Sequence, residues 1–179
     1  GIKTTPLEIA KFLNDQKIVA VFNGKAEAGP RALGNRSILF DPRNSYAKII
    51  VNKVKNREWY RPFAASILKP YFKEYFETHG LDESKFMTIS FQSKTKKIPG
   101  VVHVDNSCRV QTVDTDIPHF HALLEEFNKI TKIPVLLNTS FNKAGEALVE
   151  TVEDAIFTFE NSKIDILWFP EKNKMIKKI

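Results

Sequence analysis

Short apolar runs alternate with stretches of helical spacing along the chain, and polar residues separate them where turns are expected. Residues 18–22 and 134–137 are continuous apolar runs that contain β-branched residues, which predicts strands buried in a sheet. Weaker or alternating patterns predict further strands elsewhere. The full set of expected strands is 18–22, 37–40, 64–68, 86–91, 101–104, 110–113, 134–137 and 164–169.

Apolar residues spaced three and four apart predict helices between these strands. Thr4 or Thr5 can cap a first helix that has Pro6 near its start and ends at Asn14–Gln16. Thr151 and Asp154 have the spacing of a capping box. The remaining expected helices are a helix capped by Ser45 that runs to Val54, with Ile49, Ile50, Lys53 and Val54 on one side, and helices at 70–76, 120–130 and 152–160.

The mixture of strands and helices predicts one α/β or α+β domain, residues 1–179, built around a mixed twisted sheet. The lysine-rich tail from Glu171 is expected to fray. The chain starts directly at an expected helix, so it could be a piece of a longer protein.

Composition narrows the class of partner. The 179 residues carry a net charge of +6 and a pI near 9.3, which favours an anionic partner such as a nucleotide, another phosphate ester or a nucleic acid. Cys108 is the one cysteine in the sequence, so no intrachain disulfide is possible, and a reducing compartment is expected. There is no apolar run long enough for a membrane span and no signal-peptide core, so we expect a cytoplasmic protein without a membrane partner.

Polar clusters at the ends of the expected strands hold the candidate chemistry. Residues 23–43 join two strands through three glycines, a lysine and several arginines, a composition that suits an anion. Ligands usually bind at strand ends outside an open sheet, so we expect four such loops to converge on one face. They contribute Arg31, Arg36, Lys55, Arg57, Arg61, Arg109, Asn138 and Ser140. A solvated surface turn and a scattered basic face are the open alternatives.

Other reactive residue types give weaker signals. His79, His103, His119 and His121 lack metal-ligand spacing, and no Ser-His-Asp arrangement can be assembled. His119 and His121 are expected to face solvent, and His103 could be a core residue or could line a site. Cys108 is expected to be a small buried residue.

The ordered blocks resemble one family. Residues 24–39, GKAEAGPRALGNRSIL, are similar to the signature of the carboxy-terminal domain of O-carbamoyltransferases of the nodulation protein U and antibiotic-tailoring type. Three further blocks resemble that family in the same order: NKVKNRE with RPFA at 52–64, HVD with RVQTV at 103–113, and NTSFN at 138–142. One departure is Lys25, where the family often has arginine.

The resemblance implies a YrdC-like domain that activates carbamoyl phosphate with ATP, as a magnesium complex, to carbamoyl adenylate. An amino-terminal domain of the actin-like ATPase fold, absent from this chain, would then transfer the carbamoyl group to a hydroxyl of a small molecule and would carry the metal site. By resemblance the catalytic residues are Arg31, Arg36, Lys55 and Arg61, and the substrate-binding residues are Lys25, Arg57, Arg109, Asn138 and Ser140. No permanently bound cofactor is implied.

Two other functions remain open. A basic nucleotide- or RNA-binding module would use the same concave face without catalysis, although a nucleic-acid partner is not expected. A non-catalytic scaffold for a partner domain is the third possibility.

Overall fold

A mixed sheet organises the computed structural model, which describes residues 1–178. The strand order is β1-β10-β9-β2-β3-β8-β4-β7-β6-β5, and the pairs β2–β9 and β4–β7 are parallel whereas the others are antiparallel. The strands are β1 (Ile2–Lys3), β2 (Val19–Phe22), β3 (Arg36–Phe40), β4 (Ala64–Leu68), β5 (Phe76–Glu77), β6 (Ser90–Ser93), β7 (Ser107–Val113), β8 (Val135–Ser140), β9 (Ile166–Phe169) and β10 (Lys174–Lys177).

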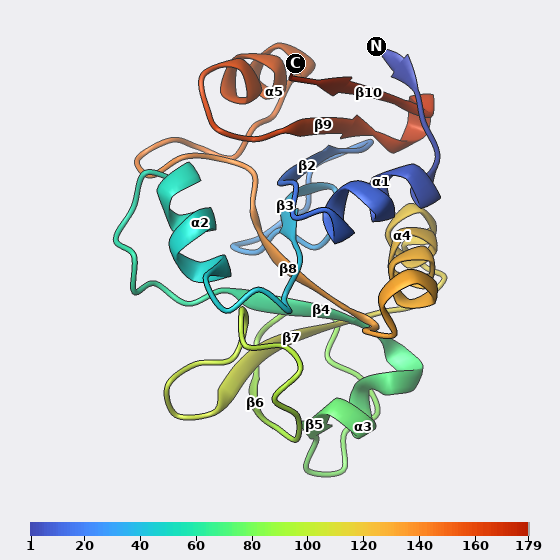
Figure 1. Ribbon diagram of the computed structural model, residues 1–179, viewed down its shortest axis with the longest axis vertical. Helices are drawn as coiled ribbons and strands as arrows, with labels where there is room; N and C mark the ends of the chain where they lie inside the picture. Colours follow the sequence, from blue (N-terminus) through green and yellow to red (C-terminus); the bar gives the residue numbers. More distant parts are fainter. Residues whose placement is uncertain (179) are drawn as a thin grey trace.

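Helices lie on both sides of the central strands. In Figure 1, α1 and α4 pack together on one side, and α2 and α5 lie on the other. Every residue of β3 and β4 is buried, as expected for strands covered on both faces. The helices are α1 (Pro6–Asn14), α2 (Ala47–Val54), α3 (Phe72–Tyr75), α4 (Pro118–Thr131) and α5 (Val152–Glu160), with 3₁₀ turns at Lys69–Tyr71 and Pro170–Lys172. Within the described part of the chain, no helix is long and apolar enough to cross a bilayer.

The expected caps of the first and last helices are confirmed. Thr5 and Glu8 form a capping box at the start of α1, and Thr151 and Asp154 form one at the start of α5. The prediction that Ser45 caps α2 is wrong. The Asn44 side chain accepts a hydrogen bond from the Tyr46 backbone at 2.8 Å, and this turn starts the helix instead.

The expected core face of α2 is also partly wrong. Val51 and Val54 are buried, but Ile49 is 49% exposed and Asn52 is fully buried. The Asn52 amide donates to the carbonyl oxygens of Trp59 and Arg61, each at 2.9 Å. A polar side chain therefore takes a core position because it holds the loop that follows the helix.

Strand predictions in the middle of the chain need correction. Residues 101–104 form a turn rather than a strand, because the His103 amide donates to the Ser107 carbonyl at 2.8 Å and the chain reverses there. The expected strand at 86–91 appears only from Ser90, after Met87 at φ +53°. The expected helix 70–76 divides into a 3₁₀ turn and the single turn α3.

The carboxy-terminal tail is ordered through residue 178, so the prediction that it frays is wrong. Residues of β10 pair antiparallel with β9 and with β1. Figure 1 shows both ends of the chain on the same side of the molecule. Backbone pairing with two strands replaces the solvent contacts that a lysine-rich tail was expected to make.

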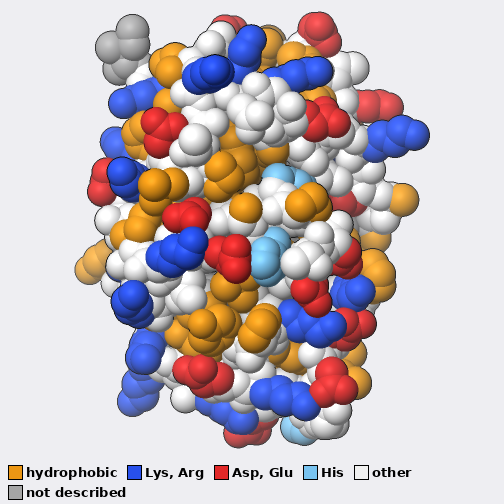
Figure 2. All heavy atoms as spheres, turned by 90° about the vertical axis from the view of Figure 1, so that its right-hand side faces the viewer, with side chains coloured by type: hydrophobic (Ala, Val, Ile, Leu, Met, Phe, Trp, Pro, Cys, Tyr) orange, Lys and Arg blue, Asp and Glu red, His pale blue; other side chains and the backbone are white. Residues whose placement is uncertain are grey.

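Charges of both signs are interspersed on the face that carries α1 and α4. Figure 2 views this face and shows lysine and arginine side chains alternating with aspartate and glutamate. On α4, for example, the exposed Lys129 pairs with the partly buried Glu126 at 2.7 Å. The net positive charge of the chain is therefore not gathered on this face.

Candidate functional site

Three neighbouring strands frame a small polar cavity at one end of the sheet. Ala64 of β4 lies opposite Arg109 of β7 on one side and opposite Asn138 of β8 on the other. Residues in register on adjacent strands project to the same face, and the small Ala64 side chain leaves space between its two neighbours. The space is a cavity of about 100 Å³, here called the central cavity.

Five of the predicted site residues line the central cavity. Arg31 comes from the loop between β2 and β3, and Arg57 comes from the loop between α2 and β4. Arg109, Asn138 and Ser140 come from the strands β7 and β8 themselves. Segments that are far apart in the sequence therefore meet here, but the prediction that Arg109, Asn138 and Ser140 lie in loops is wrong, because β7 and β8 extend through these residues.

Two buried polar atoms at the cavity have no hydrogen-bond partner within residues 1–178. They are Nε of Arg109, a donor, and Oδ1 of Asn138, an acceptor. The amide nitrogen of Asn138 already donates to Ser66 Oγ at 2.9 Å and to the Ala32 carbonyl oxygen at 3.2 Å, which fixes the direction of the oxygen. Buried polar groups are nearly always paired, so this arrangement is complementary to a ligand that carries both a donor and an acceptor.

Positive charges crowd together around the cavity. Burial lowers the pKa of Arg109, and the nearby charge of Arg31 lowers it further. Burial, followed by the charge of Arg61, lowers the pKa of Arg57 to about 10. The Arg57 side chain is held in place by Asn52, whose Oδ1 accepts from Nε at 2.5 Å. An anion would relieve the mutual repulsion of these guanidinium groups.

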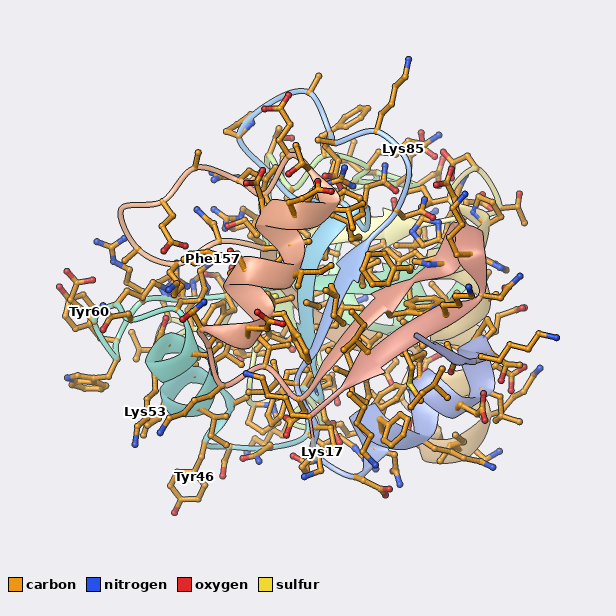
Figure 3. All side chains as sticks on the ribbon, turned by 90° about the horizontal axis from the view of Figure 1, so that it is seen from above. Lys17, Tyr46, Lys53, Tyr60, Lys85 and Phe157 are labelled. Carbon is orange, nitrogen blue, oxygen red and sulfur yellow. The ribbon has the colours of Figure 1, made fainter. Side chains whose placement is uncertain are left out.

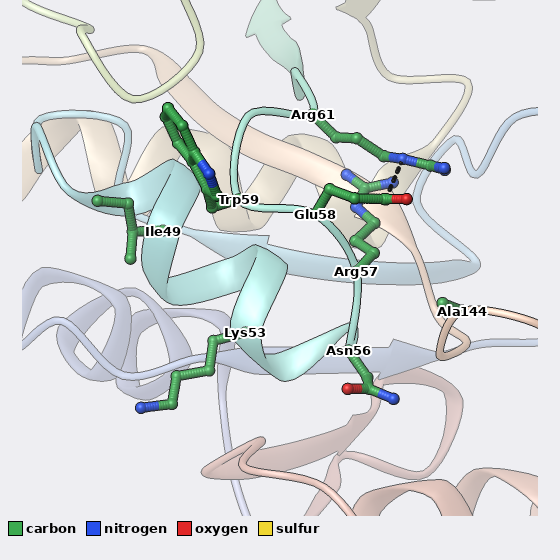
Figure 4. Close-up of a pocket in the computed structure, with 8 residues that line it drawn as sticks. All are labelled: Ile49, Lys53, Asn56, Arg57, Glu58, Trp59, Arg61 and Ala144. Atoms are coloured by element: carbon green, nitrogen blue, oxygen red, sulfur yellow. Dashed lines mark ion pairs between the residues drawn. The ribbon is translucent and has the colours of Figure 1, made fainter.

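Arg61 lies in a larger hollow next to the central cavity. Figure 4 shows this hollow, which has a volume of about 630 Å³ and is bordered by Ile49, Lys53, Arg57, Trp59, Arg61 and Ala144 among others; we call it the Trp59 hollow. The Arg61 guanidinium pairs with Glu58 at 2.7 Å. Arg57 borders both spaces, so the two hollows share its side chain as a common wall.

Arg36 is buried beneath the loop and faces backbone, not the cavity. It is 2% exposed and donates to the carbonyl oxygens of Asn23 at 2.8 Å, Gly24 at 2.9 Å and Val149 at 3.1 Å. Its guanidinium carbon lies 3.5 Å from the ring centre of Phe22. These contacts place Arg36 where it holds the 23–36 loop and outside the lining of the central cavity, and the catalytic role that the resemblance implies stays a prediction.

Lys55 is likewise buried, with 3% exposure. Its Nζ donates to the Ser140 carbonyl oxygen at 2.5 Å, the Asn142 carbonyl oxygen at 2.8 Å and Asn142 Oδ1 at 3.0 Å. Burial, with a contribution from the charge of Arg57, lowers the pKa of Lys55 to about 7. Lys55 thus holds the end of β8 in place. Because Ser140 lines the central cavity, Lys55 also positions one part of the cavity wall. Lys25 is exposed on the loop between β2 and β3.

Two residues that the sequence reasoning missed shape the 23–36 loop. Glu27 Oε1 accepts from the amides of Leu33 at 2.7 Å and Asn35 at 2.6 Å. Gly34 has φ +122°, and a Cβ placed there would come within 2.6 Å of a Phe120 ring carbon. An acidic residue inside an otherwise cationic, glycine-rich stretch was the available signal for the role of Glu27.

The other candidates separate into buried and partly exposed groups. The prediction that His119 faces solvent is wrong: Nε2 donates to the Gly34 carbonyl oxygen at 3.0 Å, and burial lowers the pKa of this imidazole. His121 is partly buried beside Glu125. His103 borders a separate hollow with Lys48 and Tyr60. Cys108 is fully buried, as predicted, and burial raises the pKa of its thiol to about 12.

The described residues show no cluster of three or more His, Cys, Asp or Glu side chains that could hold a metal ion. The donor groups around the central cavity are cations, amides and hydroxyls, which favour oxyanions over metal cations.

Comparison with known proteins identifies the family. Residues 10–178 match the family described as "Carbamoyltransferase C-terminus". Among curated proteins, the nodulation protein NolNO of Sinorhizobium fredii is 41% identical over 162 residues, which cover 87% of this chain and 24% of that protein. The nodulation protein U of Rhizobium tropici is 39% identical over 166 residues, covering 90% of this chain and 28% of that protein. The chain thus spans about a quarter of the length of these two relatives.

Solved structures show the same fold at low sequence identity. Full-length HypF, solved in a phosphate- and nucleotide-bound form, superposes with a TM-score of 0.63 at 19% identity, covering 88% of this chain and 20% of that chain. A variant of P. abyssi Sua5 superposes with a TM-score of 0.61 at 12% identity, covering 92% of this chain and 48% of that chain. The expected YrdC-like fold is confirmed, and the chain belongs to the carbamoyltransferase C-terminus family.

Proposed function

We propose that this chain activates carbamoyl phosphate with ATP, as one part of a longer O-carbamoyltransferase. The observation that carries the proposal is the pair of buried polar atoms without partners among the described residues, Arg109 Nε and Asn138 Oδ1. Their residues line the central cavity together with Arg31 and Arg57. Carbamoyl phosphate offers what both atoms lack, because its amide is a donor and its phosphate oxygens are acceptors. Family membership supports the same substrate class.

The activation would proceed in two balanced steps. Water attacks the phosphorus of carbamoyl phosphate, giving phosphate and carbamate. A carbamate oxygen then attacks the α-phosphorus of ATP and pyrophosphate leaves, giving carbamoyl adenylate. Negative charge gathers on phosphoryl oxygens in both steps, and the guanidinium groups of Arg31, Arg57 and Arg109, which line the central cavity, would stabilise it.

Magnesium would enter with the nucleotide. It would neutralise charge on the ATP phosphates, and we assign it no protein ligands. The residues of this chain would bind and orient the two anions. The Lys55 ammonium would keep Ser140 and the end of β8 in position while the anions bind.

Transfer to the acceptor hydroxyl is proposed for another part of a longer protein. The curated relatives are about four times the length matched here, so they have room for a further domain. An amino-terminal domain of the actin-like ATPase fold would take the carbamoyl adenylate and carbamoylate a small molecule. The buried single Cys108 is compatible with the cytoplasm as the compartment.

Pyrophosphate release tests the proposal. We expect the domain to release pyrophosphate from ATP slowly, and only when carbamoyl phosphate is present. Arg109→Ala should lose this activity, whereas Lys11→Ala, which removes an exposed cation on α1, should retain it. Pyrophosphate release that is independent of carbamoyl phosphate, or an active Arg109→Ala variant, would contradict the proposal.

A further inference from the structure

The central cavity is too small for a nucleotide, so part of ATP must lie outside it. Its volume is about 100 Å³, whereas ligand pockets for molecules of drug size usually hold several hundred Å³. The neighbouring Trp59 hollow has about 630 Å³. It is bordered by Arg57, which also lines the central cavity, and by Arg61, whose guanidinium pairs with Glu58 at the same hollow.

The outer wall of the hollow presents an aromatic face. The Trp59 indole is 70% exposed, and it meets Tyr60 edge-on, with ring centres 6.0 Å apart. Figure 4 shows Trp59 on the wall of the hollow opposite Arg57 and Arg61, beside Ile49 of α2. Figure 3 shows Tyr60, Tyr46 and Lys53 projecting outward on this same side of the molecule. An edge-on contact covers at most one face of one of the two rings, so it leaves a face of the Trp59 indole for a third ring.

We propose that Trp59 is the stacking platform for the base of the nucleotide, with the phosphate chain running past Arg61 and Arg57 into the central cavity. This inference rests on the proposed function, since it assigns the outer part of the same substrate. Stacking on an aromatic face depends little on which base is bound. The Trp59 wall therefore contributes affinity for a purine ring in general, and discrimination between adenine and guanine must come from elsewhere.

A second hollow with an exposed aromatic side chain is the alternative site for the base of the nucleotide. Phe86 is 64% exposed and borders, with Arg31 and Leu33, a hollow of about 370 Å³ that also adjoins the central cavity, at Pro30, Arg31 and Met87. Arg31 is the one charged side chain that borders this Phe86 hollow, whereas Lys53, Arg57 and Arg61 border the Trp59 hollow together with the carboxylate of Glu58. A triphosphate needs several cations along its path, which favours the Trp59 side.

Calorimetry on the purified domain tests the assignment with three probes: magnesium–ATP, inorganic tripolyphosphate and carbamoyl phosphate. Trp59→Ala should weaken ATP binding by roughly 5- to 100-fold, the range expected for the loss of one base–aromatic stack. Trp59→Phe should restore most of that affinity. Tripolyphosphate and carbamoyl phosphate should bind all three proteins within about two-fold of each other, because neither has a ring to stack. Phe86→Ala should bind ATP like the wild type.

Tryptophan fluorescence gives an independent readout. The sequence has two tryptophans, and Trp168 is 2% exposed, so a ligand stacked at the surface should quench Trp59. ATP should quench the emission, tripolyphosphate should not, and Trp59→Phe should abolish the response.

The outcomes separate the two proposals. Unchanged ATP affinity in Trp59→Ala, an equal loss for ATP and tripolyphosphate, or a loss in Phe86→Ala alone would overturn the stacking platform while leaving the proposed function intact. A wild-type domain that binds neither ATP nor carbamoyl phosphate would overturn both.

Discussion

Arg109 and Asn138 lie on either side of Ala64 in one row across the strands β7, β4 and β8. Each contributes one buried polar atom that lacks a partner among the described residues, a donor on Arg109 and an acceptor on Asn138. Sheet register therefore places two complementary hydrogen-bonding groups 29 positions apart in the sequence at the same small cavity. Ala64 must be small because a larger side chain between Arg109 and Asn138 would fill the central cavity.

Removing the Arg109 side chain should weaken anion binding more than it weakens the fold. Each charge-assisted hydrogen bond that is lost should cost about 1.5–3 kcal/mol of binding free energy. Titration calorimetry of Arg109→Ala with carbamoyl phosphate measures this loss. Lys11→Ala is the control for the change in net charge, and equal affinities of Arg109→Ala and the wild type would remove Arg109 from the site.

Arg36→Ala should be a folding variant. Its guanidinium is the partner of five backbone carbonyl groups and stacks on Phe22, so its removal should leave buried acceptors unpaired. We expect a loss of about 3 kcal/mol or more in the free energy of unfolding, measured with urea.

Arg31→Ala is the matched comparison for Arg36→Ala. Its one hydrogen bond in the described chain is an exposed contact to the Pro30 carbonyl at 3.4 Å, so stability should change by less than about 0.5 kcal/mol while anion binding weakens. The reverse pattern, a stable Arg36→Ala and an unstable Arg31→Ala, would show that these roles are assigned wrongly.

Lys55 should make stability depend on pH above neutrality. Its pKa falls from 10.5 to about 7 in the folded state, so between these values the unfolded chain binds the proton more strongly. The contribution of Lys55 to the free energy of unfolding must therefore rise as pH increases from about 7 toward 10.5. Urea denaturation of the wild type and Lys55→Met at pH 7, 8.5 and 9.5 isolates this term, because the other titrating groups are common to both. A difference that stays flat or falls with pH would contradict the prediction.

Gly34→Ala should destabilise the protein more than Gly29→Ala. Both glycines have positive φ, +122° and +116°, so both substitutions carry backbone strain of about 1–3 kcal/mol. Only the new Cβ at Gly34 meets Phe120, at 2.6 Å, whereas nothing lies within 4 Å of one at Gly29. Thermal unfolding should show a lower midpoint for Gly34→Ala, by an amount that reflects the added clash. Equal midpoints would show that the α4 contact does not constrain the loop.

The sequence by itself determined the main elements and most of the inventory of the site. Continuous apolar runs identified β2 and β8, and capping residues identified the start of α1 and α5, because these signals are local. The ordered motif blocks identified the family and its fold. Local patterns could not detect β10 or the turn at 101–107, because strand pairing partners and chain reversals depend on distant segments.

Only the tertiary structure decided which cations face the cavity. Arg31, Arg36 and Arg57 are equivalent in a sequence, since each is an arginine in a polar loop. Packing buries Arg36 against five carbonyl groups and leaves Arg31 and Arg57 at the cavity. The physical reason is that a buried guanidinium needs hydrogen-bond acceptors, and for Arg36 these are backbone oxygens of residues up to 114 positions away in the sequence.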